Sequence, residues 1–313
     1  MKKDNTEDSP KKKKSRLSTV LIILILLIGL AIMAYPTFSD WWNSFHQSRA
    51  IASYTEAVEE LDPKMMNAML KAADDYNKRL LRKANRYSMS DEELEEYESL
   101  LDLTGSGVMG YIQIKSIGVN LPIYHGTDES ILQIAIGHIQ GTSLPVGGTS
   151  THSALSGHRG LPSAKLFSDL DKMKEGDTFT ITVLNRTLTY QVDQIEVVLP
   201  EEIEGLSITA GQDYCTLITC TPYGINTHRL LVRGKRIDNI AGEYVILPDA
   251  AEIPSFVVIT VIVLPLIFVV LLLLLVYYRR RKPTMSRLEG ENYLRVITNN
   301  TKAGIWKNRS SEK

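Results

Sequence analysis

Two long apolar runs, each bordered by basic residues, constrain this chain more than any other feature of its sequence. The first extends from Leu17 to Tyr35 without a charge and follows the lysine-rich residues 11–16. The second extends from Phe256 to Val276 and is followed by the basic residues 279–282. About 20 apolar residues suffice for a helix to span a bilayer, so either run is long enough to cross a membrane.

The basic flanks also predict the topology, because positive charge is retained on the cytoplasmic side. We expect cytoplasmic basic tails at 1–16 and 279–313, a signal-anchor helix at 17–35, a second transmembrane helix at 253–278 and an outward-facing region between the helices. A cleaved signal peptide is the alternative for the first run, since it ends in the small residues of 31–34. A buried core helix is the alternative for the second run, and its length and basic flank argue against that. The net charge of -1 says little as a total; we expect the cell membrane as a partner and no nucleic acid.

The cysteines of the outward region give the next constraint. Such domains commonly use cysteines in disulfides, but this chain has only Cys215 and Cys220. They lie five residues apart in a segment whose alternation and β-branched residues predict a strand. An odd separation places the two side chains on opposite faces of a strand, so a bond between them is geometrically implausible. We therefore expect at least one free thiol.

The outward region begins with a helical part, residues 36–105. From Gln47 to Leu101 apolar residues recur at helical spacing, which predicts one-sided helices that pack on a neighbouring element. The first apolar stripe consists of Ile51, Tyr54, Val58 and Leu61, and the second of Met65, Met69, Ala72, Tyr76 and Leu80. Asp62-Pro63 predicts an N-cap followed by proline at the first helical position, and Ser90-Asp-Glu-Glu93 predicts a capping box.

From about residue 106 the pattern changes to short β-rich runs separated by turns such as Glu175-Gly-Asp177. The predicted strands are Tyr111–Lys115, Thr151–Ser156, Asp177–Leu184, Leu188–Leu199, Asp213–Cys220 and Arg229–Ile237. Many short strands of this kind indicate a barrel or a sandwich. We assign residues 106–240 to a mainly β domain and residues 241–252 to a linker.

A thiol becomes a nucleophile only where its surroundings favour the thiolate, so a histidine and a cation are the groups to seek. His158 lies in the glycine-flanked turn Ser156-Gly-His-Arg-Gly160 at the end of a predicted strand. Cys220 ends another strand, and the chain turns before a new strand starts at Arg229, so a hairpin sets Arg229 near Cys220. A guanidinium there can hold a substrate carbonyl and the oxyanion that forms from it. Arg233 returns to the same face of the strand, so strand parity does not choose between the two arginines.

These residues carry a resemblance to a known family. Thr216-Leu-Ile-Thr-Cys220 matches the sortase signature Thr-Leu-x-Thr-Cys. The stretches 155–167, 221–224 and 226–233 are similar to the pilus-assembling class C sortases of Gram-positive bacteria. The resemblance covers about residues 48–240 and extends to the second predicted transmembrane helix. It implies a mainly β fold: an eight-stranded sortase-type closed β-barrel with N-terminal helices packed on it, plus two transmembrane helices.

The resemblance also implies an activity and the roles of three residues. Cys220 is the nucleophile, His158 the proton-transfer partner and Arg229 the clamp for substrate and oxyanion. In such an enzyme the cysteine attacks the Thr-Gly amide of a Leu-Pro-x-Thr-Gly-like sorting signal, and a lysine amine of another pilin resolves the thioester. The expected partners are pilins with C-terminal sorting signals and the membrane. No cofactor and no metal is expected. Cys215 is expected in the core, and His125, His138, His152 and His228 are expected to be solvated or structurally bonded.

One feature of class C sortases is missing from this sequence. Many of them carry an Asp-Pro-aromatic lid motif between the N-terminal helices and the barrel, where this chain has Tyr87-Ser88-Met89. Asp62-Pro63-Lys64 lies too early, lacks the aromatic residue and is explained by helix capping. We hypothesise instead that Tyr87 or Met89 covers the cleft by apolar contact.

Three other functions are compatible with parts of the sequence. A sortase that attaches surface proteins to a peptidoglycan precursor would use the same three residues and a different amine. A cysteine protease would use water, but no protease motif supplies the usual Asn or Asp partner. A membrane-tethered scaffold or binding domain would leave Cys220 inert.

Overall fold

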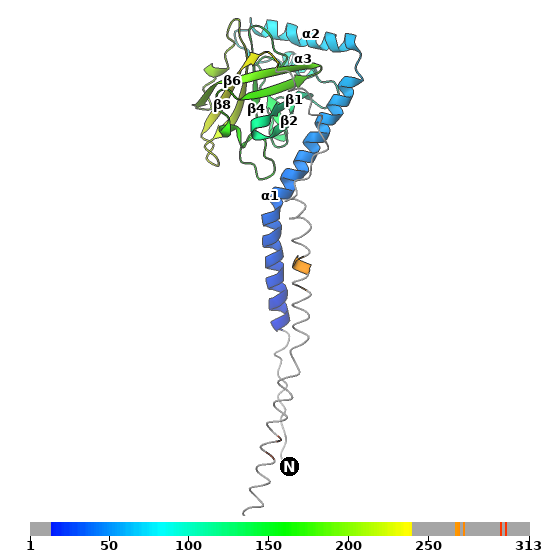
Figure 1. Ribbon diagram of the computed structural model, residues 1–313, viewed down its shortest axis with the longest axis vertical. Coiled ribbons are helices and arrows are strands. Elements are labelled where there is room, and N and C mark those ends of the chain that lie inside the picture. Colours follow the sequence, from blue (N-terminus) through cyan, green and yellow to red (C-terminus); the bar gives the residue numbers. More distant parts are fainter. Residues whose placement is uncertain (1–13, 240–266, 270–271, 273–294, 296–297, 299–313) are drawn as a thin grey trace, which may run out of the picture. The chain divides into compact units, whose positions relative to one another are not determined.

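The computed structural model describes residues 14–239, 267–269, 272, 295 and 298 (Figure 1). The expected linker at 241–252 lies outside the described residues. So do most of the expected second transmembrane helix at 253–278 and most of both expected basic tails.

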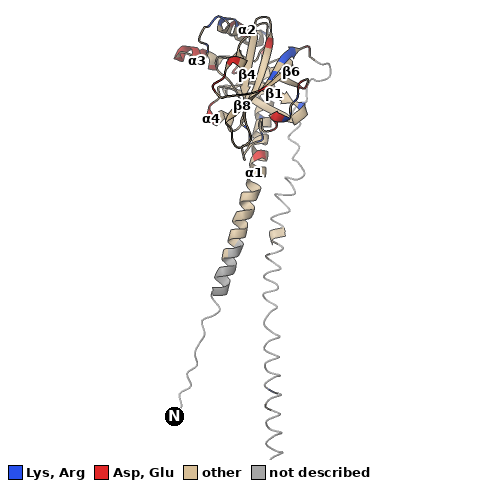
Figure 2. Ribbon diagram, turned by 90° about the vertical axis from the view of Figure 1, so that its left-hand side faces the viewer, with Lys and Arg blue, Asp and Glu red and all other residues tan. Residues whose placement is uncertain are grey.

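The N-terminal apolar run belongs to one long helix, α1, which spans Lys14–Glu59. The part of α1 from Leu24 onward contains an apolar stretch long enough to cross a membrane, and that stretch is exposed. Figure 2 shows the apolar described part of α1 without charged residues, in contrast to the acidic helix α3. The beginning of α1 therefore has the composition expected of an anchor, while its end, at Ile51 and Tyr54, is buried against the barrel.

Two further helices follow α1, and their start signals are confirmed. Helix α2 spans Pro63–Leu80; Asp62 is its N-cap, accepting a hydrogen bond from the backbone N–H of Lys64, and proline occupies the first helical position. Helix α3 spans Asp91–Ser99 and begins with the predicted capping box of Ser90 and Glu93.

The predicted apolar face of α2 is partly wrong. Tyr76 and Leu80 are buried as expected, but Met65 is 58% exposed and Ala72 is exposed as well. The buried positions in the first half of the helix are Met66, Leu70 and Ala73. Two adjacent apolar stripes satisfy helical spacing here, and packing selects the stripe that continues in phase into Tyr76 and Leu80.

The remaining chain forms a closed eight-stranded barrel with strand order β1-β2-β3-β4-β7-β8-β6-β5. The pairs β2–β3 and β4–β7 are parallel and the others are antiparallel. The strands are β1 (Val108–Ile114), β2 (Val119–His125), β3 (Ile136–His138), β4 (Thr151–Ser156), β5 (Thr178–Val183), β6 (Arg186–Val198), β7 (Asp213–Thr221) and β8 (His228–Ile237). Short helices connect them: α4 (Glu129–Leu132) and the 3-10 turns η1 (Lys115–Ile117), η2 (Leu170–Lys172) and η3 (Glu204–Leu206).

The six predicted strands are all present, with ends that differ by up to three residues. Strands β2 and β3 were not predicted from the pattern. Pro122 interrupts the apolar run of β2 and contributes no N–H to a ladder, which hides a strand from sequence reading. Strand β3 has only three residues, too few for any periodicity.

The end of α1 is joined to the barrel by a buried tyrosine. Tyr54 is 2% exposed, and its hydroxyl donates to the carbonyl of Met109 and accepts from the N–H of Leu184, at 3.0 and 2.7 Å. These bonds satisfy two backbone groups that the barrel strands leave free. The helix is therefore part of the folded domain and not a detached stalk.

Candidate active site

Strand β7 carries two cysteines in very different surroundings. Cys215 and Leu217 belong to the main core, whereas Ile218 packs in a second cluster with Leu206 of η3. Cys215 is fully buried, and burial raises the pKa of its thiol well above the usual value, so it stays protonated. Cys220 lies at the end of the strand, on the face of Ile218, and is partly exposed. Both thiols are free, and Cys220 alone is accessible at a strand end.

Arg229 lies directly opposite Cys220 in the antiparallel pair of β7 and β8. On the other side of β8 it pairs with Val198 of β6, so the arginine lies between the two strands that flank β8. In the described part of the chain, its guanidinium donates only to carbonyls of its own turn, to Asn226 at 3.5 Å and to His228 at 3.2 Å. Among the described residues it forms no ion pair with a carboxylate, so the cationic group remains available to a ligand.

Arg233 has a different position and a committed side chain. It pairs with Thr216, four residues back along β7 from Cys220. Its Nε and Nη2 donate to the carboxylate of Asp193 at 3.0 and 2.9 Å, and its guanidinium lies 4.4 Å from the ring centroid of Tyr214. The carboxylate beside it raises the pKa of Arg233. The two arginines, which strand parity does not distinguish, therefore differ in their partners: Arg233 is paired with Asp193, and Arg229 lies opposite Cys220.

His158 follows β4, the parallel neighbour of β7. Ser156 pairs with Ile218, so two residues further on His158 and Cys220 reach the same level of the barrel. Two hydrogen bonds extend the contact beyond the strand: Gly157 N–H donates to Ile218 at 3.0 Å, and the Thr219 hydroxyl donates to Gly157 at 2.8 Å. The structure thus brings His158, Cys220 and Arg229 to one end of three neighbouring strands.

Both glycines around His158 are required by packing. A Cβ at Gly157 would come within 2.5 Å of Ile136 and 2.8 Å of the Phe167 ring. Gly160 has a φ of +77°, and a Cβ there would lie 3.0 Å from the ring of Tyr223 in the β7–β8 turn. The glycines let the histidine loop pack closely on the barrel and on the turn that follows the cysteine.

Arg159 joins the same two loops. Its Nη1 donates to the hydroxyl of Thr221 at 3.3 Å, its guanidinium lies 5.8 Å from the Tyr223 ring centroid, and it forms an ion pair with Asp171. Only 8% of its side chain is exposed. A buried guanidinium with these contacts fixes the geometry between the histidine loop and the β7–β8 turn.

Glu129 is a site residue that sequence reasoning missed. Its carboxylate lies 3.6 Å from Nε2 of His158, which has no hydrogen-bond partner among the described residues. A hydrogen bond from Gln133 and the charge of His158 lower the pKa of Glu129, so the carboxylate stays ionised. It stands at the start of α4, 29 residues before His158 and outside any motif, so the sequence offered no signal for it.

Three other histidines are structurally bonded. His138 is fully buried between Tyr97 and Ser143, His125 bonds to the carbonyls of Gly107 and Leu100, and His152 bonds to Ser207 and Thr216. Burial lowers the pKa of His138 to about 4. Within the described part of the chain, no cluster of three or more His, Cys, Asp or Glu residues suits a metal ion.

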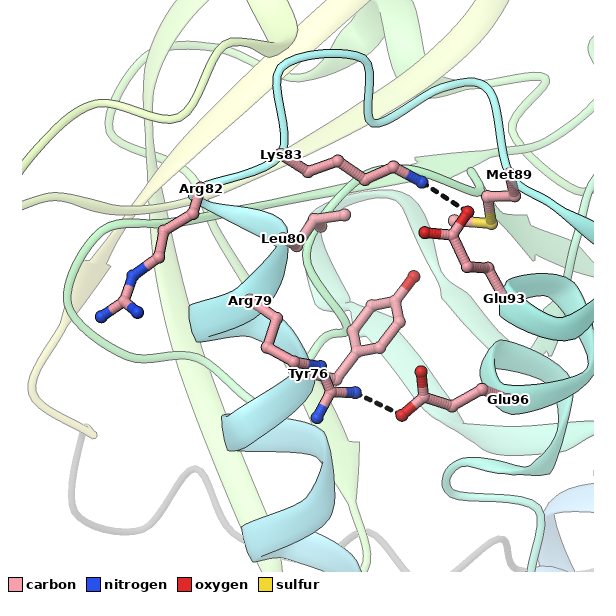
Figure 3. A pocket seen from close by; sticks show the side chains of 8 residues that line it. All are labelled: Tyr76, Arg79, Leu80, Arg82, Lys83, Met89, Glu93 and Glu96. Carbon is pink, nitrogen blue, oxygen red and sulfur yellow. Dashed lines mark hydrogen bonds and ion pairs between the residues drawn. The ribbon is translucent and has the colours of Figure 1, made fainter.

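The segment between α2 and α3 contains Tyr87 and Met89, the two residues hypothesised to cover the cleft. Met89 lines a pocket of about 290 Å³ between the two helices, beside Tyr76 and the ion pair of Lys83 and Glu93 (Figure 3). Tyr87 lies against Gly141, where an added Cβ would be 2.9 Å from its ring. These contacts hold the two side chains on the helices and on the loop after β3.

The neighbouring Arg86 provides the link from this segment towards the cysteine. Its guanidinium donates to the carbonyl of Leu206 at 2.9 Å, and Leu206 packs on Ile218 of β7. The segment therefore contacts the connection that covers the outer face of β7.

Comparison with known proteins connects this geometry to a family. Residues 112–237 match the family model described as Sortase domain. The crystal structure of sortase C1 from Streptococcus agalactiae is 52% identical with a TM-score of 0.59, and the match covers 61% of this chain and 100% of that one. Sortase C from Streptococcus pneumoniae is 45% identical with a TM-score of 0.56, over 61% of this chain and 97% of that one. Sortase C from Clostridium perfringens, solved with the C-terminal cell wall sorting motif, is 44% identical with a TM-score of 0.55, over 61% and 99%.

Proposed function

Because this chain belongs to the sortase family, whose members are cysteine transpeptidases, we propose that it is a membrane-anchored enzyme that polymerises pilins. It would cleave a Leu-Pro-x-Thr-Gly-like sorting signal and join the new carboxyl group to a lysine amine of another pilin. The observation that carries the proposal is the position of Arg229 directly opposite the accessible Cys220. The class C neighbours support the pilin substrate, since the pneumococcal enzyme was analysed for pilin substrate specificity.

In the first half of the proposed reaction, the Cys220 thiolate attacks the carbonyl carbon of the Thr-Gly bond. The guanidinium of Arg229 donates hydrogen bonds to the resulting oxyanion, a stabilisation that is strongest where charge develops. Protonated His158 gives its proton to the glycine nitrogen, the C–N bond breaks, and the substrate remains on Sγ as a thioester. The leaving group is the free amine of the glycine segment.

In the second half, a lysine amine attacks the thioester carbonyl while the now neutral His158 accepts a proton from it. The attack forms a tetrahedral intermediate with an oxyanion, which collapses to an amide as the C–S bond breaks and regenerates the Cys220 thiolate. Arg229 holds the second oxyanion as it held the first. The product is an isopeptide bond between two pilins, and the protonation state of the enzyme is restored.

Membrane anchoring is part of the same proposal. The apolar exposed helix α1 supports an anchor at residues 17–35, with the barrel outside the cell and the N-terminal tail in the cytoplasm. A return span at 253–278 would place the C-terminal tail in the cytoplasm too. Anchoring the enzyme beside substrates that are themselves membrane-held raises their effective concentration.

The acceptor distinguishes this proposal from anchoring to peptidoglycan. The full-length enzyme would be incubated with a protein that ends in a Leu-Pro-x-Thr-Gly signal, and with either a lysine-bearing pilin domain or a peptidoglycan-type amine. We expect ladders linked through lysine, absent in Cys220→Ala and retained in the matched variant Cys215→Ala. If the enzyme used the peptidoglycan-type amine alone, the proposed function would be wall anchoring and not pilin polymerisation. Hydrolysis without any transfer would contradict both.

A further inference from the structure

The part of α1 between the apolar run and the barrel has two unlike faces; we call residues 36–47 the juxtamembrane segment. One face is aromatic, with side chains at the i, i+3, i+4 and i+7 positions that share one side of a helix: Phe38, Trp41, Trp42 and Phe45. Phe38, Trp42 and Phe45 remain 45%, 51% and 47% exposed. The rings of Phe38, Trp41 and Trp42 lie against one another, with centroid distances from 5.8 to 6.4 Å.

The opposite face is polar and binds the barrel. Asp40, Asn43 and Gln47 follow the spacing i, i+3 and i+7, on the far side of the helix from the aromatic face. Asn43 Nδ2 donates to the carbonyl of Ser163 at 2.8 Å, and Asp40 Oδ1 accepts from the N–H of Lys165 at 2.7 Å. Gln47 Nε2 donates to a different part of the barrel, the carbonyl of residue 134, at 2.7 Å.

The two bonds of Asp40 and Asn43 reach the loop that carries the candidate catalytic histidine. Residues 157–168 leave β4 with His158 near one end, and the loop closes where Phe167 N–H donates to His158 O at 3.1 Å. Ser163 and Lys165 lie in this loop, so α1 holds its far side while Phe167 holds its near side. The backbone of His158 thus depends on a loop whose position the juxtamembrane segment fixes.

The height of this contact above the membrane follows from helix geometry. Asp40 and Asn43 lie five and eight residues beyond Tyr35, the last residue of the apolar run. At ~1.5 Å per residue they are about 8 and 12 Å beyond the hydrocarbon layer. A headgroup layer is roughly 5–8 Å thick, so the aromatic face begins within it and the histidine loop is held near its outer edge. Aromatic side chains favour this interface.

We propose that the aromatic face of the juxtamembrane segment begins at Phe38 in the outer lipid headgroup layer and continues through Trp41 and Trp42 at the outer edge of that layer, while Asp40 and Asn43 position the His158 loop, so that the reaction takes place at the membrane surface. The inference rests on the proposed function, because an active site at the membrane surface is useful to an anchored transpeptidase whose substrates are themselves held in the membrane. The occupant of the aromatic face is the lipid of the bilayer that α1 enters, since the face continues directly from the apolar run. Asp40 and Asn43 are positioning residues that act through the loop.

Tryptophan fluorescence tests the depth of the aromatic face. Trp306→Phe leaves Trp41 and Trp42 as the remaining tryptophans of the full-length chain. This variant would be reconstituted into phosphatidylcholine–phosphatidylglycerol vesicles whose lipids carry a nitroxide quencher either on the headgroup or near the end of an acyl chain. We expect stronger quenching from the headgroup nitroxide. Quenching no greater than in nitroxide-free vesicles, as a protein partner on this face would produce, or stronger quenching from the acyl-chain nitroxide, would overturn this half of the inference.

Substitutions on the polar face test the positioning role. Asp40→Ala removes the acceptor for Lys165, and Asn43→Asp turns a donor into a carboxylate that faces the Ser163 carbonyl. With a soluble Leu-Pro-x-Thr-Gly peptide, we expect each variant to lower kcat for thioester formation on the order of tenfold with KM unchanged. Asp40→Asn keeps an acceptor oxygen and should restore kcat. Gln47→Ala, on the same face but bound to residue 134, is the matched control and should keep the wild-type kcat.

The outcomes separate this inference from the proposed function. A wild-type chain that forms no thioester would contradict the proposed function itself. A wild-type chain that forms it, together with Asp40→Ala and Asn43→Asp variants that keep the wild-type kcat, would overturn only the positioning role. Failure of Asp40→Asn to restore kcat would also overturn that role, since the conservative variant retains the hydrogen bond.

Discussion

Arg229 and Arg233 lie on the same strand, yet only Arg229 is opposite Cys220, while Asp193 holds Arg233 in a bidentate ion pair. A planar guanidinium that has no carboxylate partner among the described residues can donate two hydrogen bonds to a carbonyl oxygen and to the oxyanion that forms from it. The guanidinium of Arg233 is already paired with Asp193 of β6, so it stabilises the barrel instead. The two arginines should therefore respond differently to the same conservative substitution.

We expect Arg229→Lys to lower kcat/KM for peptide cleavage by about 100-fold, because a point charge replaces two aligned donors to the oxyanion. Its melting temperature should remain near the wild-type value, since the hydrogen bonds of the side chain within the described part of the chain go to carbonyls of its own turn. Arg233→Lys is the matched variant: it should keep catalysis and lose stability with the Asp193 pair. Peptide cleavage and thermal unfolding would be measured on the same preparations. The reverse pattern would assign the clamp to Arg233.

Glu129 offers a test of the charge beside the histidine. Its carboxylate lies 3.6 Å from His158 Nε2 and is 70% exposed, so the pair interacts through a solvent-screened field. We expect Glu129→Gln to slow thioester formation about two- to threefold at low ionic strength and to have little effect at high ionic strength. Glu175→Gln, at an exposed turn, serves as the control. An equal loss at low and high salt would show that Glu129 acts through packing and not through charge.

Buried His138 predicts a pH dependence of stability. Burial lowers its pKa from 6.5 to about 4, so it stays neutral in the folded protein while the unfolded chain takes up a proton below pH 6.5. The unfolded state then binds more protons, and stability should fall as the pH drops from about 6.5 to about 4, by ~3 kcal/mol in full. Burial also lowers the pKa of His152, which adds to the same trend.

Unfolding measured between about pH 7 and about pH 5 would test this dependence. His138→Asn should flatten the pH dependence even though it loses hydrogen bonds to Tyr97 and Ser143. The variant His228→Asn alters an exposed bond to Thr227 and should keep the wild-type slope. An unchanged slope in His138→Asn would contradict the assignment of the proton to this histidine.

The hypothesis that Tyr87 or Met89 covers the cysteine remains a prediction that point substitutions can test. Deleting residues 36–100 would not be a clean experiment, because Tyr54 and Tyr97 are buried in the domain. Tyr87→Ala and Met89→Ala change the segment while keeping both. Since the two side chains lie against Gly141 and the α2–α3 pocket, we expect peptide hydrolysis to stay within about twofold. A rise of tenfold or more in either variant would establish an apolar lid.

Much of the fold could be read from local pattern, and the exceptions have physical reasons. Alternation predicted the two cysteines on opposite faces of β7, and the caps at Asp62 and Ser90 were confirmed because they depend on neighbouring residues alone. Strands β2 and β3 were missed because proline and shortness remove their signal. The buried face of α2 was shifted by one residue, since two apolar stripes fit the spacing and only tertiary packing distinguishes them.

For the site, motif and hairpin reasoning named residues that the fold brings to one end of the barrel. The sequence could not distinguish the two arginines, because their partners, Asp193 and Cys220, come from other strands. It could not indicate Glu129 either. The bond between Asn43 and Ser163 joins residues 120 positions apart, a separation that no local period reports.

Intact-mass spectrometry can show whether Cys220 carries the substrate as a thioester. The full-length enzyme in detergent would be mixed with a Leu-Pro-x-Thr-Gly peptide set with x varied, and the adduct located by proteolysis. We expect an adduct of the peptide fragment that ends in threonine, attached at Cys220, released by hydroxylamine, absent in Cys220→Ala and present in Cys215→Ala. An adduct on Cys215, or continued peptide cleavage by Cys220→Ala, would contradict this expectation.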